Sequence, residues 1–276
     1  MACSVWLHSS SLSHTLLPVL CRQTTISTTS LRFNRLSSAA RFFSSSIDRT
    51  NSPVLVQAKR RGGSSSLKED LVASPSDLHF EAPLKIVKYP NPILRARNKR
   101  IVTFDDNLKK LVDEMFDVMY KTDGIGLSAP QVGMNVQLMV FNPVGERGEG
   151  EDIVLINPRV NKYSKKKVLF NEGCLSFPGI YADVQRPEAV KIDAQDINGA
   201  RFSFNLSGLP ARVFQHEFDH LEGILFFDRM TEEVLDSIRI QLQALEKKYE
   251  EKTGFPSPER VEARRGRKAA VGFGKS

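Results

Sequence analysis

Apolar residues recur at intervals of three and four in three stretches of the chain, which is the period of an amphipathic helix. These stretches cover residues 107–121, 207–223 and 231–252. In the second stretch Ser207 is suited to the N-cap position, and Gly223 stands where a helix would end. The third stretch is too short for a self-contained coiled coil, so we expect it to pack on the core or on a partner helix.

Between the first two helices the pattern changes to strand-like runs rich in β-branched and apolar residues. Four such runs cover residues 136–142, 152–158, 189–196 and 201–207. The last two flank an Asn198-Gly199 pair, which favours a type I′ hairpin turn. This order predicts an α+β fold, with antiparallel sheets around a central helix (207–223), an N-terminal helix and a C-terminal helix.

Composition limits the classes of protein that the chain can belong to. Its 276 residues, 41% hydrophobic and 26% charged, are enough for one well-buried domain with extensions. No run of 18 apolar residues occurs, so we expect no membrane span. The net charge of +7 divides into +4 for residues 1–57, +4 for residues 256–276 and −1 for residues 58–255. The near-neutral core argues against a nucleic-acid groove across it and against a specific DNA partner.

The two ends of the chain differ in composition from the middle. Residues 1–57 are rich in Ser, Thr and Arg and contain a single acidic residue, which is typical of an organelle transit peptide that is later removed. The Ser and Thr content favours the chloroplast stroma, and the arginines leave the mitochondrion open as a second destination. Residues 58–80 are expected to form a flexible linker before a folded domain at 81–253, and residues 254–276 a basic, disordered tail.

The segment FQHEFDHLEG, residues 214–223, carries the candidate chemistry. His216 and His220 are four residues apart on the predicted central helix, which places both imidazoles on one face. Glu217 follows the first histidine, as in HExxH metal sites where a glutamate acts on a water without binding the metal. The alternative is two core histidines that make ordinary hydrogen bonds.

A catalytic metal site needs a third protein ligand and an open position. The extended HExxHxxGxxH pattern of metzincins is excluded, because its third histidine position is Phe226. Later glutamates lie on a charged helix face and are expected to be solvated: Glu246, Glu250 and Glu251. Cys174, in a turn-rich segment, offers a thiolate for Fe(II), Zn(II) or Co(II), although a buried structural cysteine is the alternative. Without the N-terminal extension it has no disulfide partner, which suits a reducing compartment.

Three motifs together resemble those of the peptide deformylase family. They are GIGLSAPQ at 124–131, EGCLS at 172–176 and QHEFDH at 215–220, and their order and spacing also match. The similarity extends over about residues 84–230, and the N-terminal extension and long C-terminal helix look most like the plant organellar B-type. Residues 81–253 are therefore expected to be the catalytic domain.

The resemblance implies a metal-dependent hydrolase that removes the N-formyl group from the formyl-methionine of nascent organelle-synthesised proteins and releases formate. The metal ligands that it implies are Cys174, His216 and His220. Glu217 would be the general base and acid, and the Gln131 side chain and the Leu175 backbone N–H would donate to the formyl oxygen. The residues that it implies for substrate binding are Ile125, Gly126 and Val213.

Two other functions and two partners stay open at this stage. The chain could be an HExxH metalloprotease, or a metal-stabilised, ribosome-associated module in which Glu217 is dispensable. The family favours Fe(II), while Zn(II), Ni(II) or Co(II) suit the same ligands. The substrates would be N-formyl-Met nascent peptides. The basic tail is either solvated or attaches electrostatically to the organelle ribosome.

Overall fold

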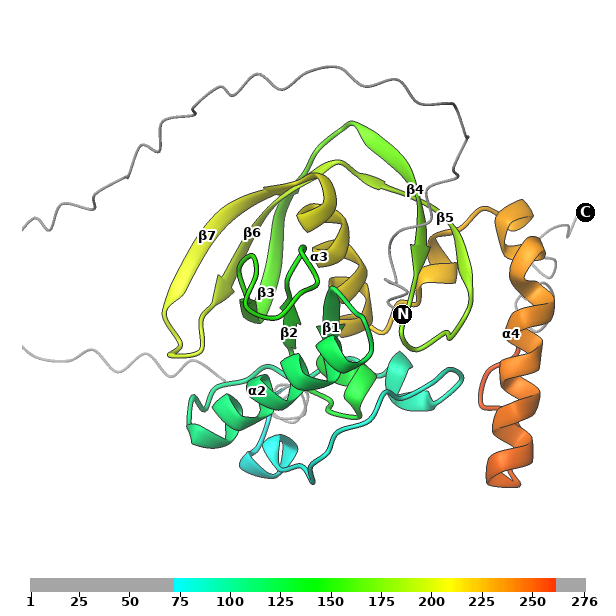
Figure 1. Ribbon diagram of the computed structural model, residues 1–276, viewed down its shortest axis with the longest axis horizontal. Coiled ribbons are helices and arrows are strands. Elements are labelled where there is room, and N and C mark those ends of the chain that lie inside the picture. The colour runs from blue at the N-terminus through cyan, green and yellow to red at the C-terminus, as the bar shows by residue number, and fades with distance from the viewer. Residues whose placement is uncertain (1–71, 262–276) are drawn as a thin grey trace, which may run out of the picture. The chain divides into compact units, whose positions relative to one another are not determined.

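The computed structural model describes residues 72–261; the predicted transit peptide (1–57), most of the predicted linker and the end of the basic tail lie outside them. The described residues form the predicted α+β fold, with a five-stranded antiparallel sheet in the order β1-β2-β3-β6-β7 and a separate β4-β5 hairpin (Figure 1). The strands are β1 (Gly126–Ser128), β2 (Leu138–Phe141), β3 (Ile153–Tyr163), β4 (Lys167–Gly173), β5 (Tyr181–Pro187), β6 (Ala189–Gln195) and β7 (Arg201–Ser207). The helices are α2 (Asp106–Lys121), α3 (Gly208–Leu221) and α4 (Glu232–Thr253), with short 3-10 turns η1 (Pro75–Leu78), η2 (Pro92–Arg95), η3 (Ala129–Val132) and η4 (Phe226–Arg229).

All three predicted helices are present. Helix α2 begins after Asp105, whose side chain accepts the Leu108 N–H, and α4 begins after Thr231, whose hydroxyl accepts the Val234 N–H. Ser207 occupies the N-cap of α3 as predicted, although its hydroxyl makes no capping hydrogen bond. No helix within residues 72–261 has both the length and the apolar character needed to cross a bilayer.

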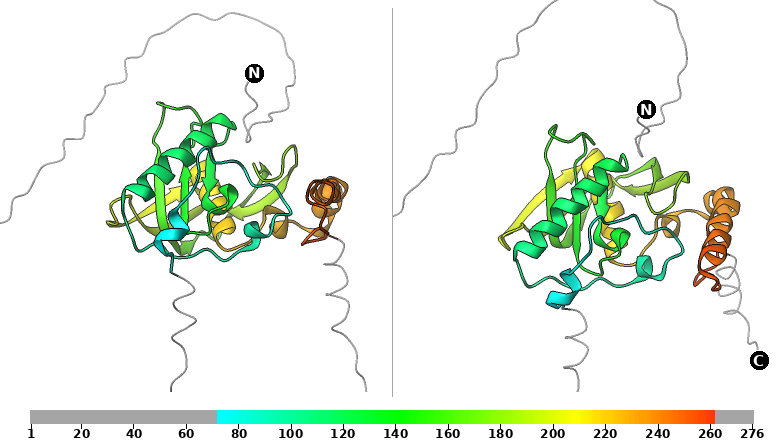
Figure 2. Two further views of the ribbon diagram at one scale, coloured as in Figure 1. Left: turned by 90° about the horizontal axis from the view of Figure 1, so that it is seen from below. Right: turned by 60° about the horizontal axis from the view of Figure 1, so that its bottom comes forward.

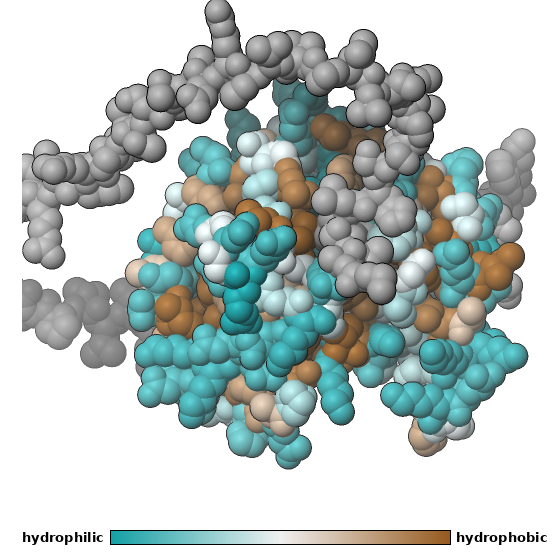
Figure 3. All heavy atoms as spheres, in the orientation of Figure 1, coloured by the Kyte–Doolittle hydropathy of each residue, from teal (hydrophilic) through white to brown (hydrophobic). Residues whose placement is uncertain are grey.

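Strand β2 forms the centre of the fold because it is covered on both faces. Its Leu138 and Val140 pack in one apolar cluster with α2, and Met139 and Phe141 pack in another with Phe214 of α3. The two helices therefore lie on opposite faces of the β1–β2 part of the sheet, as the further views show (Figure 2). The outward side of α2 is hydrophilic (Figure 3), as its amphipathic pattern predicts.

Helix α3 lies between the five-stranded sheet and the β4-β5 hairpin (Figure 1). A third apolar cluster joins this hairpin to α4 through Phe177, Phe226 and Phe227, with Leu235, Ile238 and Leu242 contributed by α4. These contacts hold α3 in the middle of the domain. Its motif side chains are consequently buried, whereas Leu209 in its first turn is 36% exposed.

Two local expectations were wrong. The β6-β7 turn is not type I′, because Gly199 has a positive φ of 83° and Asn198 does not. The Gly199 N–H bonds to the Asp196 carbonyl, so the connection is a longer loop with glycine in the left-handed position. Glu246 is not solvated: it is 7% exposed and accepts hydrogen bonds from the Tyr89 hydroxyl at 2.8 Å and the Val261 N–H at 3.0 Å.

The folded region extends into both segments that the sequence assigned to linker and tail. Ala73 and Leu78 are buried in the α2 cluster, and the Ala73 N–H bonds to the Arg100 carbonyl at 2.8 Å. At the other end Val261 is 2% exposed, and Glu259 pairs with Arg95 at 2.6 Å. Residues 72–80 and 254–261 are thus held by specific contacts to the domain.

Candidate metal centre

Two elements bring three potential metal ligands together. Cys174 directly follows β4, and His216 and His220 lie one turn apart on α3. Their ligand atoms all lie within 4.8 Å of one another, and the Cys174 Sγ is 3.2 Å from the His220 Nε2. All three side chains are at most 5% exposed. A soft thiolate with two imidazoles is a suitable donor set for a first-row divalent cation, so the residues fit the metal that the motifs imply.

Glu172 determines which nitrogen His216 presents to a metal. The His216 Nδ1 lies 3.0 Å from the Glu172 Oε2, so the carboxylate accepts the Nδ1 proton and leaves Nε2 for a cation. Glu172 is fully buried and two residues before Cys174, so the end of β4 supplies both a ligand and the group that orients another ligand.

Two buried arginines neutralise Glu172. Arg186 of β5 binds it through two bonds, Nε to Oε1 at 2.7 Å and Nη2 to Oε2 at 3.0 Å, and Arg212 of α3 donates to Oε1 at 2.8 Å. Arg186 also contacts Asp219, at 2.6 Å, and Asp219 in turn pairs with Arg229. Burial alone would raise the pKa of Glu172, but Arg186 and the His216 hydrogen bond lower it well below its usual range. The carboxylate therefore stays ionised next to the ligands.

Glu217 lies beside the metal ligands without being one of the three. Burial raises the pKa of its carboxyl to about 6, and one carboxylate oxygen, Oε2, has no hydrogen-bond partner among the described residues. A buried carboxylate with a free oxygen and a pKa near neutrality is suited to exchange a proton with a water or substrate. By contrast, burial and the nearby positive charges lower the pKa of His220, which keeps its ring neutral and able to bind a cation.

The first motif packs directly against Glu217. A Cβ at Gly126 would lie 2.6 Å from the Val213 Cγ1 and 2.9 Å from the Glu217 Oε1, so only glycine lets β1 approach α3 this closely. Ile125, the preceding residue, is buried in the same apolar cluster as Val213. The three residues predicted to bind substrate therefore lie together beside the predicted base.

The two predicted oxyanion donors also belong to this region. Gln131, in η3, donates from Nε2 toward the Cys174 Sγ at 3.5 Å, and its amide oxygen is fixed by the Ser128 N–H and hydroxyl, each at 2.9 Å. Leu175 follows Cys174, and a Cβ at Gly124 would lie 2.9 Å from its Cδ1. The structure thus brings the three motifs into contact around one centre.

Phe226 occupies the sequence position at which the metzincin pattern has its third histidine. Its side chain is 1% exposed and packs 4.9 Å from the ring of Phe177 and 6.2 Å from the ring of His216. It forms part of the apolar wall behind the ligands, in the position where the metzincin pattern has a histidine. The thiolate of Cys174 supplies the third donor instead.

The ionic network behind the metal ligands was not predicted from the sequence. Glu172 belongs to the second motif, but its contacts to Arg186 and Arg212, and the contact of Arg186 to Asp219, depend on the fold. The sequence pattern did not predict β4 or β5, so it could not place Glu172 beside Arg186.

The chain was compared with known proteins. Residues 83–235 match the family described as polypeptide deformylase. The chain is 66% identical over 273 residues to peptide deformylase 1B, chloroplastic/mitochondrial, of Arabidopsis thaliana, covering 99% of this chain and 98% of the relative. It is 63% identical over 277 residues to peptide deformylase 1B, chloroplastic, of Solanum lycopersicum, covering 100% and 99%. A crystal structure of the Arabidopsis thaliana enzyme with an inhibitor has a TM-score of 0.64 and 77% identity, covering 66% of this chain and 100% of that chain. The chain belongs to the polypeptide deformylase family.

Proposed function

We propose that the chain is a peptide deformylase that hydrolyses the bond between the formyl carbon and the methionine nitrogen of formylated nascent peptides, and releases formate. The observation that carries this proposal is the contact of three family motifs around one buried Cys–His–His centre. Proteases that use HExxH for peptide bonds lack this cysteine-containing arrangement, and Phe226 removes the histidine that metzincins use.

Each residue near the centre has a definite task in this proposal. Cys174, His216 and His220 hold the metal, which when bound polarises a water and the formyl oxygen. Glu217 takes a proton from the attacking water and returns it to the leaving amine, a role for which its pKa of about 6 is suited. The Gln131 amide and the Leu175 N–H stabilise the negative charge that develops on the formyl oxygen.

Substrate position follows from the neighbouring residues. Ile125 and Val213 form part of an apolar wall for the methionine side chain, and Gly126 leaves room for its own peptide group to contact the substrate backbone. A side chain at Gly126 would meet the Glu217 carboxylate, so this glycine keeps the space beside the base open.

A pair of variants on one helix tests the role of Glu217. We expect Glu217→Ala to lower turnover of a formyl-Met-Ala-Ser peptide by on the order of 10² to 10⁴, with metal content retained. Glu222→Ala, an exposed glutamate at the end of α3, is the control and should keep normal turnover. Near-normal formate release by Glu217→Ala would contradict the assigned role.

The proposal also covers the resident metal and the organelle in which the protein is located. We infer Fe(II) as the resident metal, because the family resemblance favours it and the Cys–His–His set accepts it as well as Zn(II), Ni(II) or Co(II). Metal analysis of protein prepared without oxygen tests this, and a different metal that supports full activity would contradict it. The names of the relatives and the Ser/Arg-rich residues 1–57 support a chloroplast location, with the mitochondrion as a second one.

The basic residues that follow the domain support a ribosome contact. Residues 262–276 contain five basic residues and one acid, and a polyanion such as ribosomal RNA would attract them. Truncation after Val261 keeps the buried Glu246–Val261 contact, so it removes the tail without disturbing α4. If ribosome co-sedimentation at low salt is unchanged by this truncation, the tail has no such role.

A further inference from the structure

The sheet has a solvent-facing surface formed by residues outside the three motifs. Helix α2 covers one face of the sheet at β1 and β2, but among residues 72–261 no helix continues over this face at β3, β6 and β7. A pocket of about 610 Å³ lies here, between the segment at Arg100 and the strands. We call its surroundings, residues Arg100, Arg159, Lys162, Lys191 and Arg201, the arginine face.

Strand register places the basic residues of the arginine face on one side. Arg159 lies opposite Asp193, and Gln195 lies opposite Arg201. Because residues two apart in a strand share a face, Lys191 joins Asp193 and Gln195, and its partner Lys162 lies on the same side. Basic side chains thus occupy three levels of this face, at positions 191, 193 and 195 of β6, which span about 13 Å.

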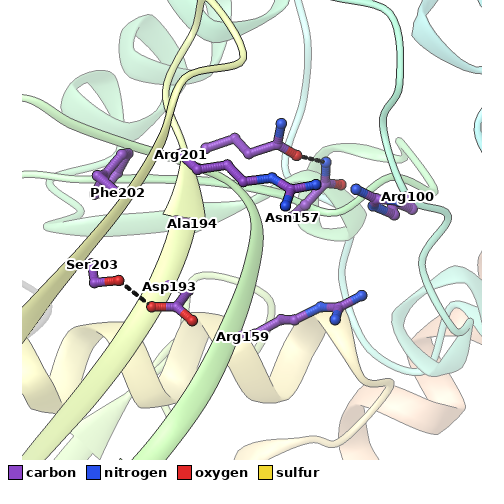
Figure 4. A pocket seen from close by; sticks show the side chains of 9 residues that line it. Arg100, Asn157, Arg159, Asp193, Ala194, Arg201, Phe202 and Ser203 are labelled. Carbon is purple, nitrogen blue, oxygen red and sulfur yellow. Dashed lines mark hydrogen bonds between the residues drawn. The ribbon is translucent and has the colours of Figure 1, made fainter. Parts of the chain in front are cut away.

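The positive charge of this face is only partly offset, because its acid Asp193 lies opposite Arg159 and attracts Lys191. None of its five basic residues has an ion-pair partner among the described residues. The acid within the pocket, Asp193, accepts the Ser203 hydroxyl instead. In Figure 4 the side chains of Arg100 and Arg201 extend toward Asn157, whereas the Arg159 side chain, which also lines the pocket, lies apart from them. Residues 58–255 therefore carry a local cationic surface although their formal charges sum to −1.

Asn157 gives this pocket a fixed shape. It sits at a β-bulge with a φ of 51°, and its side chain bonds both to the Ile101 backbone, at 2.8 and 2.7 Å, and to the Gln195 side chain at 2.7 Å. These bonds tie the Arg100 segment to the sheet. The arginines are consequently presented from a rigid base, which lowers the entropy lost when they bind a ligand.

The chemistry of this surface selects phosphate groups in a chain. Arginine forks match phosphate oxygens, whereas the Asn157, Gln195 and Ser203 side chains already donate to groups of the protein. Most residues that line the pocket are charged or polar; its apolar members are Ala194 and Phe202, and Phe202 lies at the side opposite Arg100 (Figure 4). Protein interfaces depend on large apolar anchors at their centre, whereas backbone binding to nucleic acid depends on cations and polar donors.

We propose that the arginine face binds the phosphate backbone of RNA without sequence preference. The choice of RNA rests on the proposed function, since the substrate of a deformylase is a chain newly made on RNA-containing ribosomes. The surface is separate from the basic tail, because its residues belong to the folded sheet and to the segment that packs on it. It would therefore keep binding RNA when the tail is removed.

The test measures binding of a fluorescent single-stranded oligouridine to the full chain as salt is varied. The variant Arg100→Gln/Arg159→Gln/Arg201→Gln should bind at least about tenfold more weakly at low salt. Since each single-strand phosphate contact contributes about 0.7 to the slope of log affinity against log salt, that slope should fall by about 2. Replacing the same arginines with lysine keeps the charge and should restore part of the affinity.

The matched control removes the same charge elsewhere. Lys85, Lys88 and Lys248 are exposed and lie away from this face, so their change to Gln should alter affinity by about threefold or less. Formate release by both variants should equal that of the original chain, which separates RNA binding from the proposed activity. Equal losses in the two variants, no RNA binding by the original chain, or tighter binding of an oligoglutamate than of RNA would each overturn the proposal.

Discussion

Replacing Glu172 by Gln should destabilise the domain far more than any exposed ion pair does. The Glu172 carboxylate is fully buried and receives four contacts of 2.7–3.0 Å from Arg186, Arg212 and His216. A glutamine keeps the shape, but it removes the charge and turns an NH₂ donor toward groups that are themselves donors. The two buried guanidinium groups of Arg186 and Arg212 are then left with one carboxylate fewer to balance their positive charge.

The expected magnitude follows from this burial. Removing one partner of a buried ion pair costs about 3–5 kcal/mol, which is a large share of the roughly 5–15 kcal/mol that holds a domain folded. The corresponding fall in melting temperature is on the order of 10 °C. Because Glu172 also orients His216, metal affinity should fall by about 10- to 100-fold.

The assay is urea unfolding of the metal-free protein, followed by metal titration of each variant. Glu188→Gln is the control, because Glu188 pairs with Lys166 at 2.6 Å but its side chain is 39% exposed, so its loss should cost at most about 1 kcal/mol. The reasoning is refuted if metal-free Glu172→Gln unfolds within about 1 kcal/mol of the original chain, or if both variants lose the same stability.

The pH dependence of the same variant gives an independent check. The pKa of Glu172 is lowered in the folded protein, so its stabilising contribution is present above the ordinary carboxyl pKa of about 4.5. That contribution is lost as the pH falls through the folded pKa. The difference in unfolding free energy between the original chain and Glu172→Gln should therefore be constant near neutral pH and shrink below about pH 4. A difference that grows on acidification would contradict the assigned charge state.

Two further substitutions test contacts around the centre. Gly126→Ala would place a methyl 2.6 Å from Val213, so kcat/KM for a formyl-Met peptide should fall by on the order of 10² while metal content stays normal; unchanged kinetics would contradict the close approach. Glu246→Leu should cost about 1–3 kcal/mol in urea unfolding, because the Tyr89 hydroxyl loses its buried acceptor, whereas the exposed Glu251→Leu should cost almost nothing; equal effects would contradict the burial of Glu246.

Periodicity predicted the elements that bury apolar residues, and failed where charged residues are buried. The three helices and four of the strands were found because their inward positions are apolar. Three strands were missed. Strand β1 is only three residues long, and in β4 and β5 Glu172 and Arg186 occupy inward positions while Leu169 faces solvent with 60% exposure. The sequence pattern predicted that Glu246 is solvated, because residues 254–261, which cover it, have no periodic pattern of their own.

The metal ligands were predictable because their spacing is local or belongs to a motif, whereas their surroundings are not local. The four-residue spacing of His216 and His220 predicts that they share one face of the helix, and Cys174 was identified through its motif. The ionic network depends on contacts among β4, β5 and α3. The spacing of residues in the sequence does not predict these contacts. The same limit applies to the arginine face, whose members come from three strands and a loop.

The arrangement of α3 explains why a charged network, rather than apolar packing alone, surrounds the centre. His216, Asp219 and His220 lie on one face of this helix; Glu172, near the end of β4, contacts His216, and Cys174, which follows β4, contacts His220. A rotation of α3 by one residue would therefore misplace the metal ligands and break the contacts to Glu172 and Arg186 together. Apolar clusters tolerate such shifts better, because one buried methyl can replace another. We infer that the network fixes the rotation of α3, so that the ligand positions are set before any metal binds.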